Sequence, residues 1–225
     1  MKNYYSDMLS AERLKQCYEI APPRVIQYLQ AEADHVLEKI NQQDVVLDLG
    51  CGFGRIIPQL SQKAGFVIGI DISFSSLLLA RKSLQKYSNC LLAEMDALHL
   101  GFSDQSFDVV ICIQNGISAF HVDQKQLIRE SIRVAKPGGM ILFSSYSDKF
   151  WKDRLHWFQL QSEAGLLGEI DQDKTGNGEI VCKDGFRATT VGPLQFQILT
   201  SGFNVETGIV EVDDSSLFCE IKIPG

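Results

Sequence analysis

The sequence contains no long hydrophobic run and no closely spaced cysteines. No window approaches the roughly 18 apolar residues that a membrane-spanning helix needs, and residues 1–17 are polar and mixed in charge, unlike a secretory signal. The six cysteines lie far apart without a C-x-x-C pair, which argues against structural zinc and against a disulfide framework. We therefore expect a cytoplasmic protein with reduced thiols and no membrane partner.

The sequence also lacks an excess of basic residues. It has 21 basic and 28 acidic residues and a formal charge of -7, whereas proteins that bind nucleic acids usually present a basic stripe to the phosphates. We therefore expect no nucleic-acid partner. Hydrophobic residues make up 45% and charged residues 22%, as in ordinary globular proteins, and a chain of this length builds one sizeable core. We predict a single domain over residues 1–225.

Apolar periodicity predicts a regular alternation of elements in the first two thirds of the chain. Helices over 11–20 and 23–40 come first. The predicted strands are 44–49, 65–70, 90–93, 107–113 and 139–145, and the helices between them are 55–63, 73–86 and 123–134. The strands are nearly continuous in apolar residues, which is typical of a parallel sheet covered on both faces. The fold class is therefore α/β, a doubly wound, Rossmann-like sheet.

After residue 146 the alternation stops. The next predicted elements are a helix over 149–164, a polar stretch over 168–178, a hairpin over 179–190 that turns at Asp184-Gly185, and a helix over 194–200. Two final β runs, 205–212 and 217–223, are too close in sequence for a crossover helix, so they must pair antiparallel. We interpret residues 1–43 as an N-terminal helical cap and 147–192 as an insert on the acceptor side.

A glycine-rich turn follows the first predicted strand. Gly50, Gly52 and Gly54 let the backbone turn tightly and approach a ligand, beyond the carboxyl ends of the strands where open α/β sheets bind ligands. A dinucleotide fingerprint has its third glycine one position later, where this chain has Arg55, which argues against a nicotinamide-dependent oxidoreductase. No Gly-Lys-Ser/Thr follows, so a P-loop is excluded.

Three acidic residues stand at the ends of the first three predicted strands. Asp48 precedes the glycine-rich turn, and Asp71 follows the second strand about 20 residues later, where a carboxylate accepts hydrogen bonds from the two hydroxyls of a ribose. Asp96 follows the third strand and is placed to accept from an exocyclic amine such as that of adenine, with Ala97 beside it for the ring face. Together the three acids predict a ligand that contains adenosine.

Four blocks, in order along the chain, resemble the motifs of the class I S-adenosylmethionine-dependent methyltransferases that act on small molecules. They are 45–55 (VVLDLGCGFGR), 69–73 (GIDIS), 95–108 (MDALHLGFSDQSFD) and 136–139 (KPGG). The resemblance implies a seven-stranded sheet with the order 3-2-1-4-5-7-6, strand 7 antiparallel. It also implies S-adenosyl-L-methionine as cofactor and S-adenosyl-L-homocysteine as product.

The resemblance assigns roles to individual residues. It implies that Gly50, Cys51 and Gly52 contact the methionine part through their backbone, that Asp71 binds the ribose, and that Gln114 closes over the sulfonium side. The complete set predicted for the cofactor is Asp48, Gly50, Cys51, Gly52, Arg55, Asp71, Ile72, Asp96, Ala97 and Gln114.

The loop after the fourth predicted strand carries the evidence on the acceptor. Residues 114–121 (QNGISAFH) loosely resemble the Asn-x-x-x-His/Phe loops of methyltransferases acting on small amines, and they lack the Asn/Asp-Pro-Pro-Tyr of enzymes that methylate nucleic acids. We predict in-line methyl transfer to a small-molecule acceptor, at an amine nitrogen. Asn115 alone is poor provision for a metal, so none is expected. The catalytic candidates are His121 and Tyr146, and the acceptor-binding candidates are Asn115, Trp151, Tyr18 and Arg24.

Several alternatives stay open. His121 is also typical of a surface histidine at a helix entry, and Arg24 of an exposed or ion-paired arginine. The chain as a whole also fits a non-catalytic regulatory protein that binds S-adenosylmethionine, or an O- or S-methyltransferase. Turnover over a wide panel of acceptors separates these functions.

Overall fold

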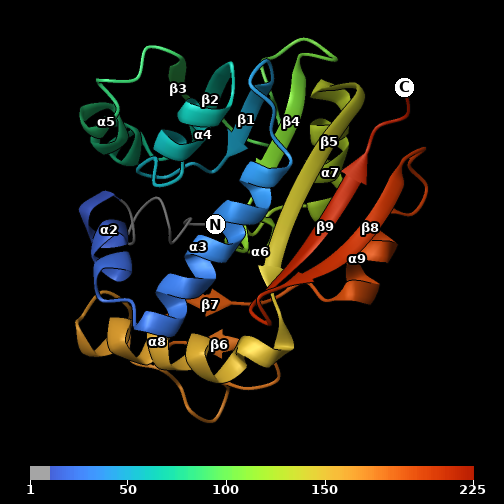
Figure 1. Ribbon diagram of the computed structural model, residues 1–225. Helices are drawn as coiled ribbons and strands as arrows, with labels where there is room; N and C mark the ends of the chain where they lie inside the picture. The colour runs from blue at the N-terminus through green and yellow to red at the C-terminus, as the bar shows by residue number, and fades with distance from the viewer. Residues whose placement is uncertain (1–10) are drawn as a thin grey trace.

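The computed structural model describes residues 11–225; the first ten residues of the predicted N-terminal cap lie outside the described residues. Its centre is a seven-stranded sheet of order β3-β2-β1-β4-β5-β9-β8 (Figure 1). The strands are β1 Val45–Leu49, β2 Phe66–Asp71, β3 Cys90–Glu94, β4 Phe107–Cys112, β5 Ala135–Tyr146, β8 Glu206–Val212 and β9 Ser216–Lys222. Only β9 runs antiparallel to its neighbours, β5 and β8. The predicted strand order and the antiparallel strand are confirmed.

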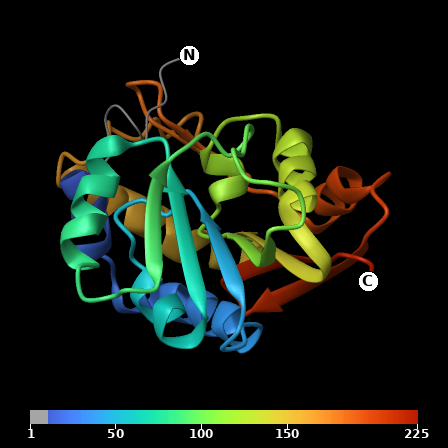
Figure 2. The same cartoon turned by 90° about the horizontal axis from the view of Figure 1, so that it is seen from above.

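Helices cover both faces of the sheet, as Figure 2 shows along the strands. The helices are α2 Ala11–Glu19, α3 Pro23–Glu38, α4 Ile57–Lys63, α5 Phe74–Ser83, α6 Gly116–Ala119, α7 Gln124–Val134, α8 Trp151–Glu163 and α9 Pro193–Thr200. One buried cluster joins the sheet to α3, α4 and α5, and another joins it to α7 and α9. Within residues 11–225, no helix is both long enough and apolar enough to cross a membrane.

The strands contribute side chains to both clusters because successive side chains point to opposite faces of a sheet. In β1, Leu47 packs on the α7 side and Val46 on the α3 side. In β9, Cys219 packs on the α7 side and Phe218 on the α3 side. Every inner strand therefore needs apolar residues at consecutive positions, which is the pattern that predicted a doubly covered sheet.

The helix boundaries follow local capping chemistry. The Asp123 side chain accepts hydrogen bonds from the backbone N–H groups of Lys125 and Gln126 and starts α7. Pro23 stands in the first turn of α3, where its missing N–H costs nothing.

Two predictions were imprecise. Residues 116–119 form the short helix α6 inside the predicted loop, and the predicted turn 136–139 lies within β5, as an irregularity in its pairing with β4.

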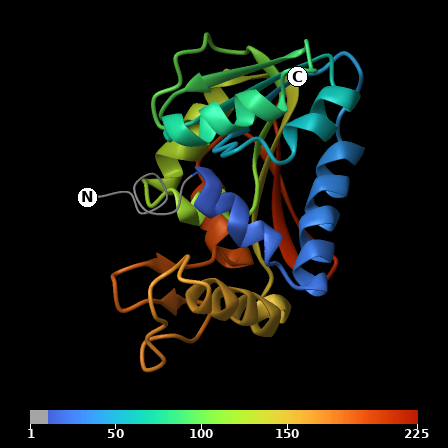
Figure 3. The same cartoon turned by 90° about the vertical axis from the view of Figure 1, so that its left-hand side faces the viewer.

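The insert packs beneath the carboxyl end of β5 (Figure 3). Its hairpin, β6 Ile180–Val181 and β7 Arg187–Ala188, turns where predicted. Arg154 on α8 holds the insert together, because its guanidinium donates to the carbonyls of Gly178 and Ala188, both at 2.8 Å, and lies 4.4 Å from the ring centroid of Tyr146. The insert, α2 and α3 share a third buried cluster.

We expect Phe218→Ala to lower the free energy of unfolding by about 3–5 kcal/mol, because it opens a cavity in a fully buried cluster between β9 and α3. Urea unfolding measures the loss. Leu194→Ala is the control: its side chain on α9 is 69% exposed, so the change stays within about 0.5 kcal/mol. Equal losses in the two variants would contradict the assignment of Phe218 to the core.

Candidate functional site

A cavity of about 160 Å³ lies at the carboxyl ends of β1, β2, β3 and β4, with residues of α2 among its walls. We call it the first cavity. Its lining residues include eight of the predicted site residues, contributed by four loops and α2: Tyr18, Gly50, Gly52, Asp71, Ile72, Asp96, Ala97 and Gln114. Parallel strands end at one edge of the sheet, so loops far apart in sequence meet here.

The glycine-rich turn is held against β2. The N–H groups of Gly50 and Cys51 both donate to the carbonyl of Ile70, at 2.8 and 2.9 Å, and the N–H of Gly52 donates to the Asp71 carboxylate at 2.9 Å. Gly50 has φ +74°, and a Cβ there would collide with the ring of Phe120, so a larger residue cannot replace it without a rearrangement. The turn therefore depends on both glycine and Asp71.

Asp71 and Asp96 present carboxylates to the first cavity. The second oxygen of Asp71 accepts from the N–H of Ser73 at 2.8 Å, which leaves lone pairs on both oxygens for a ligand. Asp96 is exposed, and it accepts from the Leu98 N–H and pairs with His99 at 3.0 Å. Burial raises the pKa of Asp96, but these two hydrogen bonds outweigh it, so the pKa lies below its usual value and the group is ionised.

Asp48 lies beneath the glycine-rich turn and does not line the first cavity. It is buried, and its Oδ2 has no hydrogen-bond partner among the described residues. Burial raises the pKa of Asp48 to about 7, although the Arg55 guanidinium acts in the opposite direction. A buried carboxylate oxygen without a partner is a natural binding point for a cationic or N–H group.

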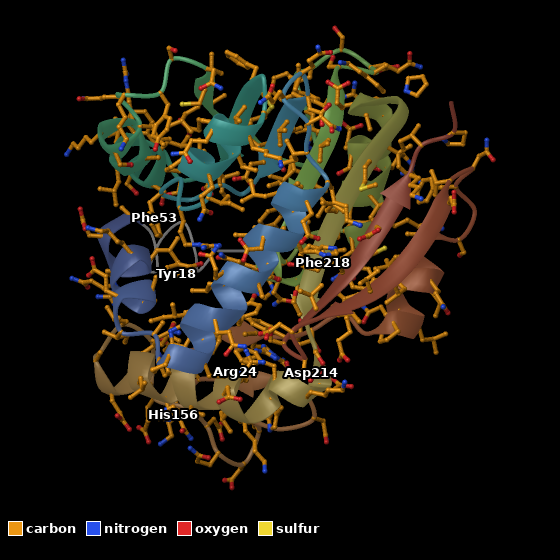
Figure 4. The ribbon with its side chains drawn as sticks, in the orientation of Figure 1. Tyr18, Arg24, Phe53, His156, Asp214 and Phe218 are labelled. Atoms are coloured by element: carbon orange, nitrogen blue, oxygen red, sulfur yellow. The ribbon has the colours of Figure 1, made fainter. Side chains whose placement is uncertain are left out.

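Arg55, Gln114 and Tyr18 form a polar contact at one wall of the first cavity. The guanidinium of Arg55 lies 5.7 Å from the ring centroid of Tyr18. Amide orientation is assigned from the hydrogen-bond network, and one orientation satisfies both neighbours of Gln114. In it, the amide oxygen accepts from Arg55 Nε at 2.7 Å and the amide nitrogen donates to the Tyr18 hydroxyl. Tyr18 also packs edge-on against Phe53 (Figure 4).

Glu32 supports this contact from below, and the sequence analysis missed it. Its carboxylate accepts from the backbone N–H of Gln114 at 3.1 Å and from the Ser216 hydroxyl at 2.6 Å, and the side chain is fully buried on α3. Burial raises its pKa. A glutamate on the otherwise apolar inner face of an amphipathic helix was the available signal, since a buried carboxylate must find partners.

A second, smaller cavity of about 70 Å³ adjoins the first. The two share Leu14, Tyr18, Gln114 and Ala119. The other residues that line the second cavity are Cys17, Tyr28, Leu29, Tyr146, Trp157, Phe158 and Gln161, so none of its lining side chains is charged. Burial raises the pKa of Tyr146 to about 12, which keeps its phenol protonated at neutral pH. Tyr18 and Tyr146 are the predicted acceptor-side residues that the structure places here.

The remaining predicted residues line neither cavity. His121 is exposed at the surface. The Asn115 amide is committed to the Thr189 carbonyl at 2.9 Å and to the Ser145 hydroxyl at 2.8 Å, so it fastens the loop to the insert. Trp151 packs 5.9 Å from the Arg154 guanidinium. Arg24, in the first turn of α3, pairs with Asp213 and lies apart from Tyr18 (Figure 4).

Two of the residues predicted for the cofactor lie behind the first cavity. Cys51 is buried, and burial raises the pKa of its thiol, so the group is unreactive at neutral pH. Arg55 reaches the cavity only through Gln114 and Tyr18. Within residues 11–225, no group of three or more His, Cys, Asp or Glu side chains is placed to hold a metal ion.

The family comparison agrees with this geometry. A family model described as a methyltransferase domain matches residues 46–139, which contain every residue that lines the first cavity except those of α2. Residues 46–139 therefore form a methyltransferase domain, in agreement with the resemblance of this part of the chain to the class I S-adenosylmethionine-dependent methyltransferases. S-adenosyl-L-methionine is the cofactor that this assignment implies.

Individual methyltransferases support the assignment. The chain is 32% identical over 145 residues to methyltransferase GfsG of Streptomyces halstedii, covering 61% of this chain and 47% of GfsG. It is 35% identical over 123 residues to the malonyl-[acyl-carrier protein] O-methyltransferase of Yersinia pestis, covering 53% and 44%. The chain thus spans about half the length of these curated methyltransferases.

Solved structures match over nearly the whole chain. The PH0226 protein of Pyrococcus horikoshii has a TM-score of 0.68 at 21% identity and covers 99% of both chains. DhpI, solved as a complex with S-adenosylhomocysteine, has a TM-score of 0.64 at 17% identity and covers 94% of this chain and 92% of DhpI. At these identities the matches establish the shared fold, including the C-terminal part that the family model does not reach.

We expect Asp71→Ala to weaken binding of S-adenosylhomocysteine by roughly 10- to 100-fold, because it removes a charged hydrogen-bond acceptor from the first cavity and frees the N–H of Gly52. Calorimetric titration measures the affinity. Asp108→Ala is the matched control, since its carboxylate binds Val45 and Lys136 at the opposite end of the sheet. Unchanged affinity in Asp71→Ala would remove Asp71 from the cofactor site.

We expect Asp48→Asn to change the pH dependence of stability. The folded-state pKa of Asp48, about 7, exceeds the ordinary value of about 3.9, so between these values the folded chain binds more protons than the unfolded one and stability falls as pH rises. The asparagine does not ionise. Between about pH 5 and pH 8, the free energy of unfolding of the variant therefore falls by roughly 2–3 kcal/mol less than that of the wild type. Urea unfolding at both pH values tests this, and parallel losses contradict it.

Proposed function

We propose that this chain transfers the methyl group of S-adenosylmethionine to a small-molecule acceptor at an amine nitrogen, with the acceptor bound in the second cavity. One observation carries the proposal: a cavity that contains two carboxylates adjoins an uncharged one, and Tyr18 and Gln114 belong to the walls of both. Methyl donor and acceptor must approach within contact distance, and this arrangement brings two ligands together at one boundary.

The residues of the first cavity fit the cofactor chemically. We propose that Asp71 binds the ribose hydroxyls, and that Asp96, Ala97 and Ile72 surround the adenine. Ala97 is buried and Ile72 is 44% exposed beside the cavity, so both offer apolar surface to a ring. The unpartnered oxygen of Asp48 supplies a negative counterpart for an ammonium group beyond the glycine-rich turn, directly or through bound water.

The proposed reaction asks little chemistry of the protein. The cofactor supplies a methyl group activated by a positive sulfonium, so the chain must align the nucleophile and exclude water. The α2 helix contributes to exclusion, because Leu14 and Tyr18 belong to both cavity walls. The Tyr18–Gln114 contact and the support from Glu32 fix the boundary between the cavities.

The absence of a base supports an amine acceptor. Among the described residues that line the second cavity, the titratable groups are phenols and the Cys17 thiol, and burial raises the pKa of each of them well above its ordinary value. No lining group therefore accepts a proton at neutral pH. A neutral amine brings its own lone pair and attacks before it loses a proton, whereas an alcohol needs a base during attack. Tyr146 then orients the acceptor as a hydrogen-bond donor.

The alternative function is binding of S-adenosylmethionine without catalysis. Fold and family do not by themselves establish an acceptor. The family also includes O-methyltransferases such as the Yersinia pestis enzyme, so the acceptor atom is the finer part of the proposal. Acceptor turnover discriminates all three functions.

We expect the chain to form S-adenosylhomocysteine with isobutylamine, and not with isobutanol or isobutanethiol at the same concentration. Because only the neutral amine is a nucleophile, the rate rises with pH until the amine is fully deprotonated. Mass spectrometry of methylated product and of S-adenosylhomocysteine measures turnover. Preferred turnover of the alcohol or thiol contradicts the amine assignment. Cofactor binding without turnover over a wider panel of amines, alcohols and thiols supports the regulatory alternative.

A further inference from the structure

The second cavity contains a buried side-chain amide that the rest of the fold does not use. Gln161 lies on the inner face of α8 with Arg154, Trp157 and Phe158, and its side chain is only 3% exposed. It lines the second cavity, and it makes no side-chain hydrogen bond with any residue of 11–225. Its backbone carbonyl alone is engaged, by the N–H groups of Leu166 and Leu167.

This lack of a partner is unusual. Buried side-chain amides nearly always have hydrogen-bond partners, because removing them from water without one is unfavourable. A second polar group of the cavity is similar: the hydroxyl of Tyr28 is buried and, within the described residues, has no hydrogen bond of ordinary geometry, although it lies close enough to the Tyr146 hydroxyl to lower the pKa of Tyr146. The neighbouring Trp157, by contrast, donates its indole N–H to the Cys17 carbonyl at 2.8 Å and is satisfied.

The walls around these two groups restrict what can pair with them. No charged side chain lines the second cavity, so a charged ligand would lose its hydration without gaining a counter-ion. Its volume of about 70 Å³ is roughly half that of a cavity that takes benzene, about 150 Å³, so it admits only a small group. A carboxamide both donates and accepts, and its best counterpart does the same.

We propose that Gln161 selects the methyl acceptor, by pairing its carboxamide with an amide or lactam group of a small, uncharged amine. The Tyr28 hydroxyl donates a hydrogen bond to the same amide or lactam group. This inference rests on the proposed function, since it names the class of acceptor for the same site. It assigns to α8 the recognition of the acceptor, and to Tyr18 and Gln114 the boundary toward the cofactor.

The test uses 2-pyrrolidinone, a small neutral lactam, as the probe, titrated calorimetrically into the protein saturated with S-adenosylhomocysteine. We expect Gln161→Leu to weaken lactam binding roughly tenfold, as loss of a hydrogen-bonding partner does, with unchanged affinity for S-adenosylhomocysteine. Tyr28→Phe lowers lactam affinity in the same direction. Pyrrolidine, a ring of the same size that is a cation at neutral pH, binds more weakly than the lactam to the wild type.

Thermal stability separates recognition from a structural role. An amide that stabilised the fold would lower the melting temperature on removal, whereas replacing an unpaired buried amide by leucine leaves it unchanged or raises it. Gln159→Leu, on the same helix but outside both cavities, is the matched control and alters neither lactam affinity nor cofactor affinity.

Each contrary result has a distinct meaning. Equal lactam affinity in Gln161→Leu and the wild type, or a fall of several degrees in its melting temperature, overturns the role of Gln161. A wild type that binds S-adenosylhomocysteine but not the lactam overturns the acceptor class and leaves the methyltransferase proposal intact. A wild type that fails to bind S-adenosylhomocysteine overturns the proposed function itself, whatever the lactam result.

Discussion

The parallel pairing of β1 with β2 and β4 is the constraint on which the site depends. It sets Asp48, Asp71 and the start of the 114–121 loop at one edge of the sheet, although almost 70 residues separate the first from the last. The same pairing is what the carbonyl of Ile70 continues when it accepts from Gly50 and Cys51. The glycine-rich turn thus continues the hydrogen bonding of the sheet, and the position of β2 fixes its shape.

Buried polar groups divide into two kinds in this molecule. Those of Asn115 and Glu32 are saturated by neighbours, and they fasten loops to the framework. The Asp48 and Tyr28 oxygens lack such partners among the described residues, as do three buried serine hydroxyls that line neither cavity, and the Gln161 amide makes no side-chain hydrogen bond with residues 11–225. Saturated polar groups specify a structure, and an unsatisfied group that lines a cavity can bind a ligand there.

The sequence predicted most of the fold because its signals are local and consistent. Continuous apolar runs, glycine-rich turns and the short gap before β9 each follow from backbone rules, so the strand order and the final hairpin were confirmed. The acceptor side was less predictable because it is built from long-range packing. Nothing local distinguishes Gln161 from Gln159 on α8, and the 114–121 loop gave no sign that Asn115 turns toward the insert and His121 toward solvent.

The placement of α2 has a kinetic consequence. Leu14 and Tyr18 close both cavities, and the same helix is attached to α5 where the N–H of Ala11 donates to the Ser76 hydroxyl. In the proposed reaction, a movement of α2 that admitted or released the cofactor would also open the wall around the acceptor. The acceptor compartment is complete only when the cofactor compartment is closed. For the proposed reaction, this geometry favours an ordered sequence, with the methyl donor entering first and the demethylated cofactor leaving last.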